Sequence, residues 1–306
     1  MSRKAVISVP VATVWTSFDS AREIDKLAVS RSIDIQTWLE SLTYETRLEL
    51  CDRNLVQSQA LFGQEVTVIE EREGWSHVVI PEQASSKDDE GYPGWIPSHQ
   101  LVKSKEQVES TQFAIVTRPF TDLYNEQNQK EVELSFQTTL PVLREYDEVV
   151  EVWTPNGKGY LNRQDIVLSS TSLSKVKGSG DDIVKSGELF LGLPYLWGGM
   201  SSYGYDCSGF SYTMCKANGY LIPRDAHDQA AEGEDVPFDQ LKRGDLLFFA
   251  NDEGKGNIRH VGIYYGDGKM IHSPKTGRDI EILSLESTTY EKELCAARRY
   301  WQEAEA

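Results

Sequence analysis

Cys207, His260 and His272 are the residues of this sequence whose types and spacing could do nucleophilic chemistry. Cys207 lies in the segment YDCSGF, at the start of a helix predicted over 207–218. Unpaired N–H groups and the helix dipole stabilise a thiolate at such a position, so we expect a lowered pKa for the Cys207 thiol. A nucleophilic cysteine also needs a base, and either histidine could be that base.

The two histidines flank a predicted hairpin, HVGIYYGDGKMIH, over 260–272. If the turn centres on Gly266 or Asp267, both imidazoles lie on one face of the hairpin, opposite or diagonal to each other. A two-residue Asp-Gly turn would instead place them on opposite faces. The first register predicts two imidazoles facing a helix that begins with Cys207, which is the arrangement of Cys-His catalysis with a third group orienting the base.

Two other interpretations of these residues stay open at this point. Cys207 could be a small structural residue near a turn, as we expect for the other three cysteines, Cys51, Cys215 and Cys295. Cys207 and the two histidines also have the ligand types of a zinc site, although they lack a pair of ligands at short spacing. In a chain of this size without a recognisable export signal, we expect the thiols to be reduced.

The elements that must position these residues belong to a predicted α+β domain over 171–306, after a polar linker at 169–180. Two helices come first, one beginning near 181 and one from Cys207 to a stop at Gly219. Apolar strands follow within 244–250, 260–274 and 293–300. Helices followed by an antiparallel sheet make an α+β fold.

The first half of the chain contains an internal repeat. GWIPSHQLV (94–102) aligns with GYLNRQDIV (159–167), and an alternating apolar stretch precedes each segment. The repeat resembles the last strands of bacterial SH3-like domains. We therefore expect two all-β SH3-like barrels, over 1–105 and 110–170, the first with a helical insertion within 19–50. The loop at 81–93 is long and polar for a hairpin, which is typical of a mobile or functional segment.

The C-terminal motifs resemble those of the NlpC-type cell-wall cysteine peptidases. The matching segments are YLWGGMSSYGYDCSGF (195–210), IPRDAHDQ (222–229), LKRGDLLFF (241–249) and RHVGIYYGDGKMIHSP (259–274). The resemblance implies a papain-like fold with Cys207 as nucleophile, His260 as base and His272 as the orienting residue. One position departs from the family pattern, because Ala226 stands where many members have a serine.

Paired SH3-like domains before this catalytic domain resemble the γ-D-glutamyl-L-diamino acid endopeptidases of murein peptide recycling. The resemblance implies a small murein peptide substrate with a free N-terminal L-Ala. Asp225 would then receive the ammonium and Arg224 the α-carboxylate of D-Glu. The further residues expected to bind substrate are the cleft aromatics Tyr195 and Trp197, Asp206 and Ser208 beside the nucleophile, and Tyr92 from the first barrel.

Composition limits the remaining possibilities. The formal net charge of −17 argues against nucleic acid as a partner. No run of about 18 apolar residues is present, so we expect no membrane span. We further expect a monomer without metal or cofactor, cytoplasmic, or secreted or wall-associated if a leader was trimmed. The alternative functions are remodelling of intact peptidoglycan, an amidase or acyltransferase on the same fold, and a cell-wall binding module. The sequence does not indicate which diamino acid is accepted.

Overall fold

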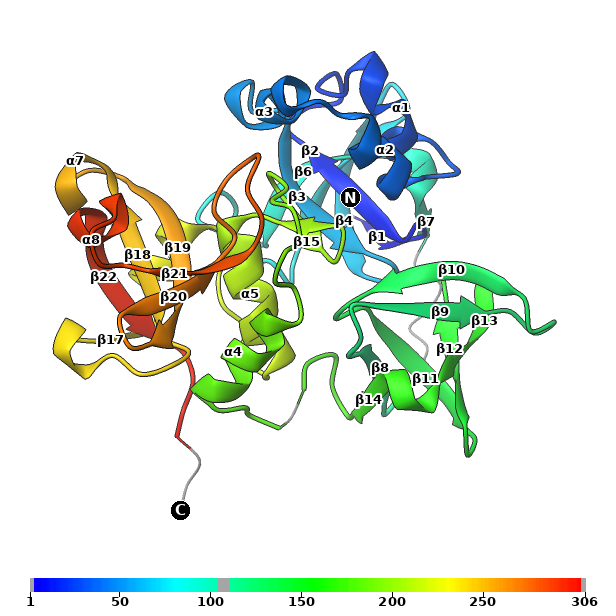
Figure 1. Ribbon diagram of the computed structural model, residues 1–306. Helices are drawn as coiled ribbons and strands as arrows, with labels where there is room; N and C mark the ends of the chain where they lie inside the picture. Colours follow the sequence, from blue (N-terminus) through cyan, green and yellow to red (C-terminus); the bar gives the residue numbers. More distant parts are fainter. Residues whose placement is uncertain (1–2, 104–109, 175, 304–306) are drawn as a thin grey trace. The chain divides into compact units, whose positions relative to one another are not determined.

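The computed structural model describes residues 3–103, 110–174 and 176–303, which form two compact units (Figure 1). Unit 1 contains 3–82, 87–174 and the short segment 201–203. Unit 2 contains 176–200 and 204–303 together with the segment 83–86. The predicted boundary between the barrels, 105–110, lies almost entirely outside the described residues. Among the described residues, no helix has the length and apolar character needed to cross a lipid bilayer.

The first barrel of unit 1 is a seven-stranded antiparallel sheet interrupted by a helical segment. The strands follow the order β3-β2-β6-β5-β4-β1-β7. Their bounds are β1 Arg3–Ile7, β2 Val11–Trp15, β3 Val56–Leu61, β4 Glu65–Arg72, β5 Trp75–Ile80, β6 Tyr92–Pro97 and β7 Leu101–Lys103. The helical elements are η1 Glu23–Asp25, α1 Lys26–Val29, α2 Ile35–Ser41, α3 Tyr44–Asp52 and η2 Ser98–Gln100.

The helical insertion lies between β2 and β3, as predicted. Asp34 caps α2 and Thr43 caps α3, each side chain accepting a hydrogen bond from a backbone N–H three residues later. The fully buried Asp25 carboxylate accepts from Arg22 Nε at 2.8 Å and from Trp38 Nε1 at 2.9 Å, so its charge is paired inside the insertion.

The second barrel repeats the first strand for strand, in the order β10-β9-β13-β12-β11-β8-β14. Its elements are β8 Phe113–Val116, β9 Phe120–Tyr124, β10 Lys130–Ser135, β11 Thr139–Glu145, β12 Val149–Thr154, β13 Gly157–Asn162, η3 Arg163–Asp165 and β14 Ile166–Ser169. The repeat read from the sequence corresponds to a strand, a 3-10 turn and a final strand in both barrels. A short loop joins β9 to β10, where the first barrel has its helices.

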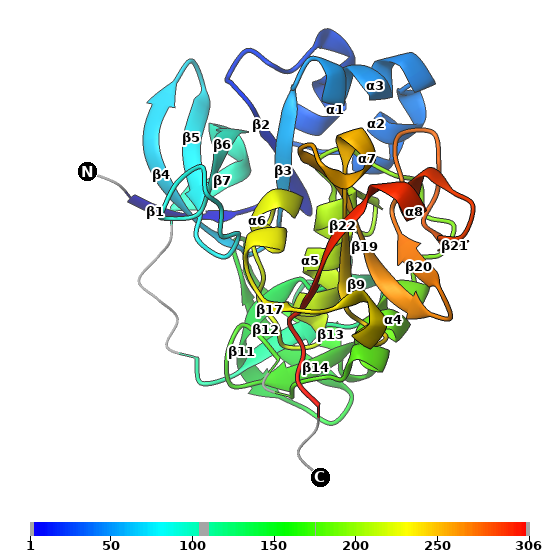
Figure 2. The same ribbon diagram turned by 90° about the vertical axis from the view of Figure 1, so that its left-hand side faces the viewer.

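Unit 2 is an α+β domain with a six-stranded antiparallel sheet in the order β17-β22-β18-β19-β20-β21. The helices α4 and α5 both contact β19 and β20 and so cover the same face of the sheet (Figures 1 and 2). The strands are β15 Met200–Ser201, β16 Gly204–Tyr205, β17 Glu234–Asp235, β18 Leu246–Ala250, β19 Ile258–Gly266, β20 Lys269–His272, β21 Glu281–Ser284 and β22 Leu294–Arg299. The helical elements are α4 Gly180–Glu188, α5 Cys207–Ala217, α6 Ala226–Ala231, η4 Phe238–Gln240, α7 Asn251–Gly254 and α8 Thr289–Glu293.

The predicted fold class is confirmed: two SH3-like barrels, the first with a helical insertion, and an α+β domain. Each barrel has its own apolar core, and a further core lies in unit 2 around Leu247, Phe249 and Met270. The predicted stop of the nucleophile helix is also present. Gly219 has a φ of +81°, and the next backbone N–H bonds back to the Cys215 carbonyl at 2.9 Å.

Candidate active site

Cys207 is the first residue of α5, as the sequence predicted. Asp206 precedes it in an extended conformation, and its carboxylate accepts a hydrogen bond of 2.6 Å from the backbone N–H of Gly209. Aspartate is among the strongest N-cap residues, so the sequence D-C-S-G begins the helix at the cysteine. The thiol therefore lies at the end of α5 where unpaired N–H groups gather.

Glycines let the chain fold tightly behind the nucleophile. A Cβ atom on Gly209 would lie 2.2 Å from the carbonyl oxygen of Gly199, and one on Gly199 would lie 2.3 Å from that of Gly204. Both contacts are with backbone, so no side-chain rotation could relieve them. The W-G-G and C-S-G motifs thus pack one loop against the first turn of α5.

Arg224 does not present the open guanidinium that we expected for a substrate carboxylate. Its side chain is 1% exposed, and Nη2 donates to Asp206 Oδ2 at 2.6 Å. Nη1 donates to Asp206 Oδ1 at 3.1 Å and to the Ser208 hydroxyl at 2.8 Å. A buried aspartate requires such a partner, so the geometry gives Arg224 the task of holding the N-cap of the nucleophile helix.

The turn of the histidine hairpin is the two-residue Asp-Gly type. Asp267 and Gly268 have φ values of 51° and 68°, and Gly266 pairs with Lys269 across them. In an uninterrupted ladder this turn would put the two histidines on opposite faces of the sheet.

A β-bulge at Tyr265 restores the productive register. The pairing shifts by one residue between Gly266 and Tyr264, which pairs with Met270. In the shifted register His272 lies opposite Gly262, where an added Cβ would lie only 3.2 Å from the His272 Cβ. His260 lies two residues from Gly262 on β19, and so both imidazoles share one face.

The two imidazoles form a direct hydrogen bond. His260 Nε2 and His272 Nδ1 are 2.8 Å apart, and both side chains are buried. The Tyr290 ring covers them, with its centroid 5.2 Å from that of His260 and 5.3 Å from that of His272. Because His260 uses Nε2 for His272, Nδ1 is the nitrogen available to the nucleophile.

The thiol lies beside the strand that carries His260. Helix α5 packs against β19, and the backbone N–H of Val261 donates to the Cys207 sulfur. The structure thus brings Cys207, His260 and His272 together in one unit. Tyr290 contributes the ring that covers the histidines and was not predicted, since its segment ESTTYEK has no motif that would single it out.

The expected lowering of the thiol pKa is wrong for this arrangement. Cys207 keeps some exposed surface, yet burial of the sulfur, followed by the negative charge of Asp206, raises the pKa of the thiol to about 12. The Val261 N–H and the Arg224 charge oppose the rise. Burial likewise holds the pKa of His260 well below its usual value and lowers that of His272 to about 3. At neutral pH the resting site therefore contains a neutral thiol and two neutral imidazoles.

The remaining predicted residues lie in both units. Asp225 precedes α6, with its carboxylate 3.9 Å from Arg224 Nη1. Tyr195 is buried, and its backbone N–H donates to the Arg278 carbonyl at 3.0 Å, while Trp197 is half-buried.

Tyr92, in unit 1, is the first residue of β6 and is 1% exposed. Its hydroxyl accepts a hydrogen bond from Lys87 Nζ and donates to Gln57 Oε1 at 3.5 Å. The expected role of Tyr92 at the substrate stays a prediction.

The segment 83–86, from the long polar loop of the first barrel sequence, belongs to unit 2. The Ala84 carbonyl accepts from the Arg224 N–H at 2.9 Å. Ser86 donates its N–H to Asp228 Oδ2 at 3.0 Å, and its hydroxyl lies 3.2 Å from His227 Nε2. The length and polarity of the loop indicated a functional segment, but its partners were not predicted.

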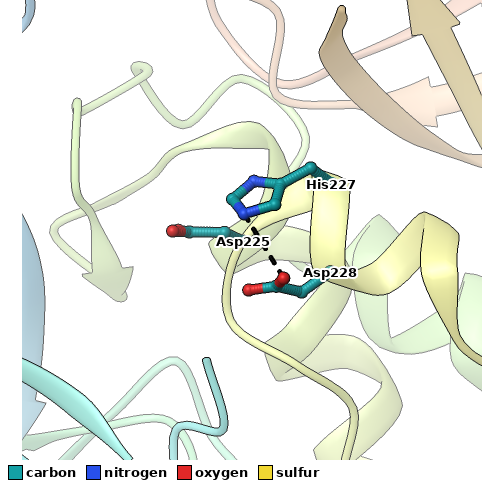
Figure 3. A group of neighbouring side chains, drawn as sticks. All are labelled: Asp225, His227 and Asp228. Carbon is teal, nitrogen blue, oxygen red and sulfur yellow. Dashed lines mark ion pairs between the residues drawn. The ribbon is translucent and has the colours of Figure 1, made fainter. Parts of the chain in front are cut away.

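Asp225, His227 and Asp228 gather on one side of the first turn of α6 (Figure 3). Their ligand atoms all lie within 4.8 Å of one another, which makes them the one group of possible metal ligands in the described part of the chain. His227 Nε2 and Asp228 Oδ1 are 3.3 Å apart, and both side chains also contact Ser86. The alternative zinc set of Cys207, His260 and His272 is not such a group.

Comparison with known proteins matches every part of this architecture. Residues 192–299 match the NlpC/P60 family, residues 116–168 the YKFC SH3b2 domain, and residues 53–101 the bacterial dipeptidyl-peptidase Sh3 domain. A relative from Bacillus subtilis (strain 168), a gamma-D-glutamyl-L-lysine dipeptidyl-peptidase, is 49% identical over 96% of this chain and 97% of its own length. A relative of the same name from Bacillus cereus is 41% identical over 97% of this chain and 91% of its own length.

A solved structure gives the same result for the fold. The crystal structure of an NlpC/P60 family protein from Bacillus cereus superposes with a TM-score of 0.94 at 41% identity, covering 98% of this chain and all of that one. Sequence and structure agree over both barrels and the catalytic domain. The chain therefore belongs to the NlpC/P60 family of cysteine peptidases, in the form that has two bacterial SH3-type domains before the catalytic domain.

Proposed function

We propose that this protein hydrolyses the γ-D-glutamyl–L-diamino acid bond of small murein peptides that begin with a free L-Ala. The observation that carries the proposal is the Cys207–His260–His272 constellation, in a chain that matches two gamma-D-glutamyl-L-lysine dipeptidyl-peptidases over nearly their whole lengths. The word dipeptidyl in those names describes release of two residues from an N-terminus. Such an activity suits free peptides better than stems whose N-terminus is linked to sugar.

The chemistry follows from the protonation states of the site. As the Cys207 sulfur attacks the γ-carbonyl, its proton passes to His260 Nδ1, because the thiol is neutral at rest. The C–N bond then breaks and the leaving amine takes that proton from His260. Water attacks the resulting thioester with His260 again as base, which releases L-Ala-D-Glu and restores the thiol.

Asp225 is our candidate for the substrate ammonium. Its carboxylate is partly buried and lies 3.9 Å from Arg224 Nη1. Arg224 makes its short hydrogen bonds to Asp206 rather than to Asp225, and a carboxylate is the type of group that pairs with a buried ammonium. Leaving one partner of a buried charge pair alone costs about 3–5 kcal/mol, which corresponds to roughly 10²–10⁴-fold in kcat/KM.

The test compares L-Ala-γ-D-Glu-L-Lys with its N-acetylated form. We expect the acetylated peptide to be cleaved about 10²–10⁴-fold less efficiently. Asp225→Asn should lose activity on the free peptide and narrow that difference, whereas the matched control Asp228→Asn, three residues further on, should keep the difference. A parallel series with meso-diaminopimelate in place of L-Lys would identify the accepted diamino acid.

Intact peptidoglycan is the substrate that we expect the enzyme not to cleave. Its stems have no free N-terminal amine, so sacculi should resist the enzyme under conditions that digest the free tripeptide. Equal cleavage of both would contradict the proposal and indicate a hydrolase that remodels the cell wall.

A further inference from the structure

The second ring nitrogen of His272, Nε2, is not used in the Cys207–His260–His272 set. The His272 side chain is fully buried, and its Nε2 atom has no hydrogen-bond partner among the residues that the structure describes. The carboxylate that approaches it is that of Glu281, with Oε1 at 3.8 Å. A buried imidazole nitrogen without a partner is unfavourable, so this gap requires an explanation.

The direction of proton transfer fixes which nitrogens carry hydrogen. His260 Nδ1 must be unprotonated to take the thiol proton, so the proton of neutral His260 lies on Nε2. That N–H donates across the 2.8 Å bond to His272 Nδ1, which must therefore be the acceptor. The proton of neutral His272 then lies on Nε2, and this N–H group faces Glu281.

The fold holds Glu281 at this position. Glu281 is the first residue of β21 and is paired directly with His272 on β20, so the two side chains share a face of the sheet. Arg278 Nη2 donates to both carboxylate oxygens, at 2.9 and 2.8 Å. The Arg278 carbonyl accepts a hydrogen bond from the backbone N–H of Tyr195, an aromatic residue that we expect to line the substrate cleft.

We propose that Glu281 is a positioning residue that completes the series Cys207–His260–His272–Glu281. Its carboxylate accepts the Nε2–H group of His272 as the gap of 3.8 Å closes, and thereby holds His272 in the tautomer that accepts from His260. When the thiol proton reaches His260, the negative charge of Glu281 stabilises the imidazolium through His272. The only proton that moves is the one from sulfur to His260 Nδ1, and the carboxylate stays unprotonated.

The expected effect is smaller than that of the catalytic residues. The Glu281 side chain is 31% exposed and shares its charge with Arg278, so solvent and the guanidinium both screen it. Glu281→Gln keeps an acceptor oxygen and removes only the charge, which should lower kcat about 3–10-fold. Glu281→Ala also removes the acceptor and frees the tautomer, so we expect roughly 10–100-fold, with KM little changed in both variants.

The experiment has one readout of rate and one that needs no substrate. Steady-state kinetics on the free tripeptide would compare Glu281→Gln and Glu281→Ala with Glu286→Gln, which removes the same charge from an exposed position nearby. Nitrogen-15 NMR of the imidazoles in the resting protein would report the tautomer of His272. We expect the Nε2–H form in the wild type and in Glu281→Gln, and a mixture of tautomers in Glu281→Ala.

The rate measurement rests on the proposed function, and the tautomer measurement does not. The proposal is overturned if His272 stays in the Nε2–H form in Glu281→Ala. It is also overturned if kcat of Glu281→Gln equals that of Glu286→Gln at equal thermal stability. Failure of the tripeptide to be cleaved by the wild type would count against the proposed function alone, because the NMR result would still decide the role of Glu281.

Discussion

Replacing Arg224 by methionine should destabilise the nucleophile helix by about 3–5 kcal/mol. The variant removes a 1% exposed guanidinium and leaves the carboxylate of Asp206, which is 7% exposed, without its cation. The hydrogen bonds from Gly209 and Ser208 would remain, at 2.6 and 3.2 Å. Methionine fills much of the same volume, so most of the loss would come from the unpaired buried charge rather than from a cavity.

The double variant Arg224→Met, Asp206→Asn isolates the electrostatic part of this loss. Asparagine is as good an N-cap as aspartate, so α5 keeps its cap while the buried charge disappears. We expect the double variant to recover most of the stability lost in Arg224→Met, because replacing both members of a buried ion pair by neutral groups is often nearly neutral.

Native-state hydrogen exchange of the α5 amides is a suitable assay, since it reports the helix itself in a chain with two units. A loss of 3–5 kcal/mol corresponds to about 10²–10⁴-fold faster exchange in Arg224→Met. Activity is not the readout, because the carboxylate of Asp225 also lies 3.9 Å from Arg224. Exchange within about threefold of the wild type, or a double variant no more protected than the single one, would refute the reasoning.

Further predictions concern the catalytic residues and their hairpin. Alkylation of the Cys207 thiol should accelerate steadily with pH up to at least pH 9, because its pKa is raised to about 12; a plateau below pH 7 would contradict the neutral resting state. His260→Ala should lower kcat about 10²–10⁴-fold. His272→Gln should lower kcat less, because the glutamine amide oxygen can accept the His260 Nε2–H. A larger loss of kcat in His272→Gln than in His260→Ala would exchange their roles. The free energy of unfolding should fall as the pH decreases from about 6.5 to about 3, because the histidines bind protons in the unfolded chain but stay neutral in the folded one. Each buried histidine should contribute up to about 1.4 kcal/mol per pH unit to this fall. Calorimetry should show a shallower dependence of the unfolding free energy on pH for His272→Gln. Deletion of Tyr265 should remove the bulge but keep Tyr264 opposite Met270, so both histidines should stay on one face. The deletion and Tyr265→Ala should then both stay within about tenfold of the wild type in kcat/KM, and loss of turnover in the deletion alone would contradict this register.

Much of the fold follows from local patterns in the sequence. The repeated segments at 94–102 and 159–167 adopt the same strand, 3-10 turn and strand, because the alternation of apolar residues and the closing turn are encoded within a few positions. The start of α5 at Cys207 is local for the same reason, since the N-cap and the glycine that it binds are three residues apart. Motif order also singled out Cys207, His260 and His272, which the fold brings together in unit 2.

Other features depended on partners far apart in the chain. Arg224 has the residue type for binding a substrate carboxylate, but the fold places Asp206, 18 residues before it, against its guanidinium. The segment 83–86 meets residues 224–228 through contacts that span more than 130 positions. The direction of the Cys207 pKa shift likewise depends on how deeply the sheet buries the sulfur, which outweighs the influence of the helix terminus.

The histidine hairpin separates the two kinds of information most clearly. The sequence by itself determined that His260 and His272 flank a hairpin, but it left open whether the turn centres on Gly266 or Asp267 or is a two-residue Asp-Gly turn; the structure has the Asp-Gly turn. Only the tertiary structure decided that the two imidazoles meet, because one extra residue at Tyr265 shifts the ladder and reverses the face on which His272 lies. Side chains alternate along a strand with a period of two, so a bulge that leaves the composition and the turn unchanged still decides whether His260 and His272 touch.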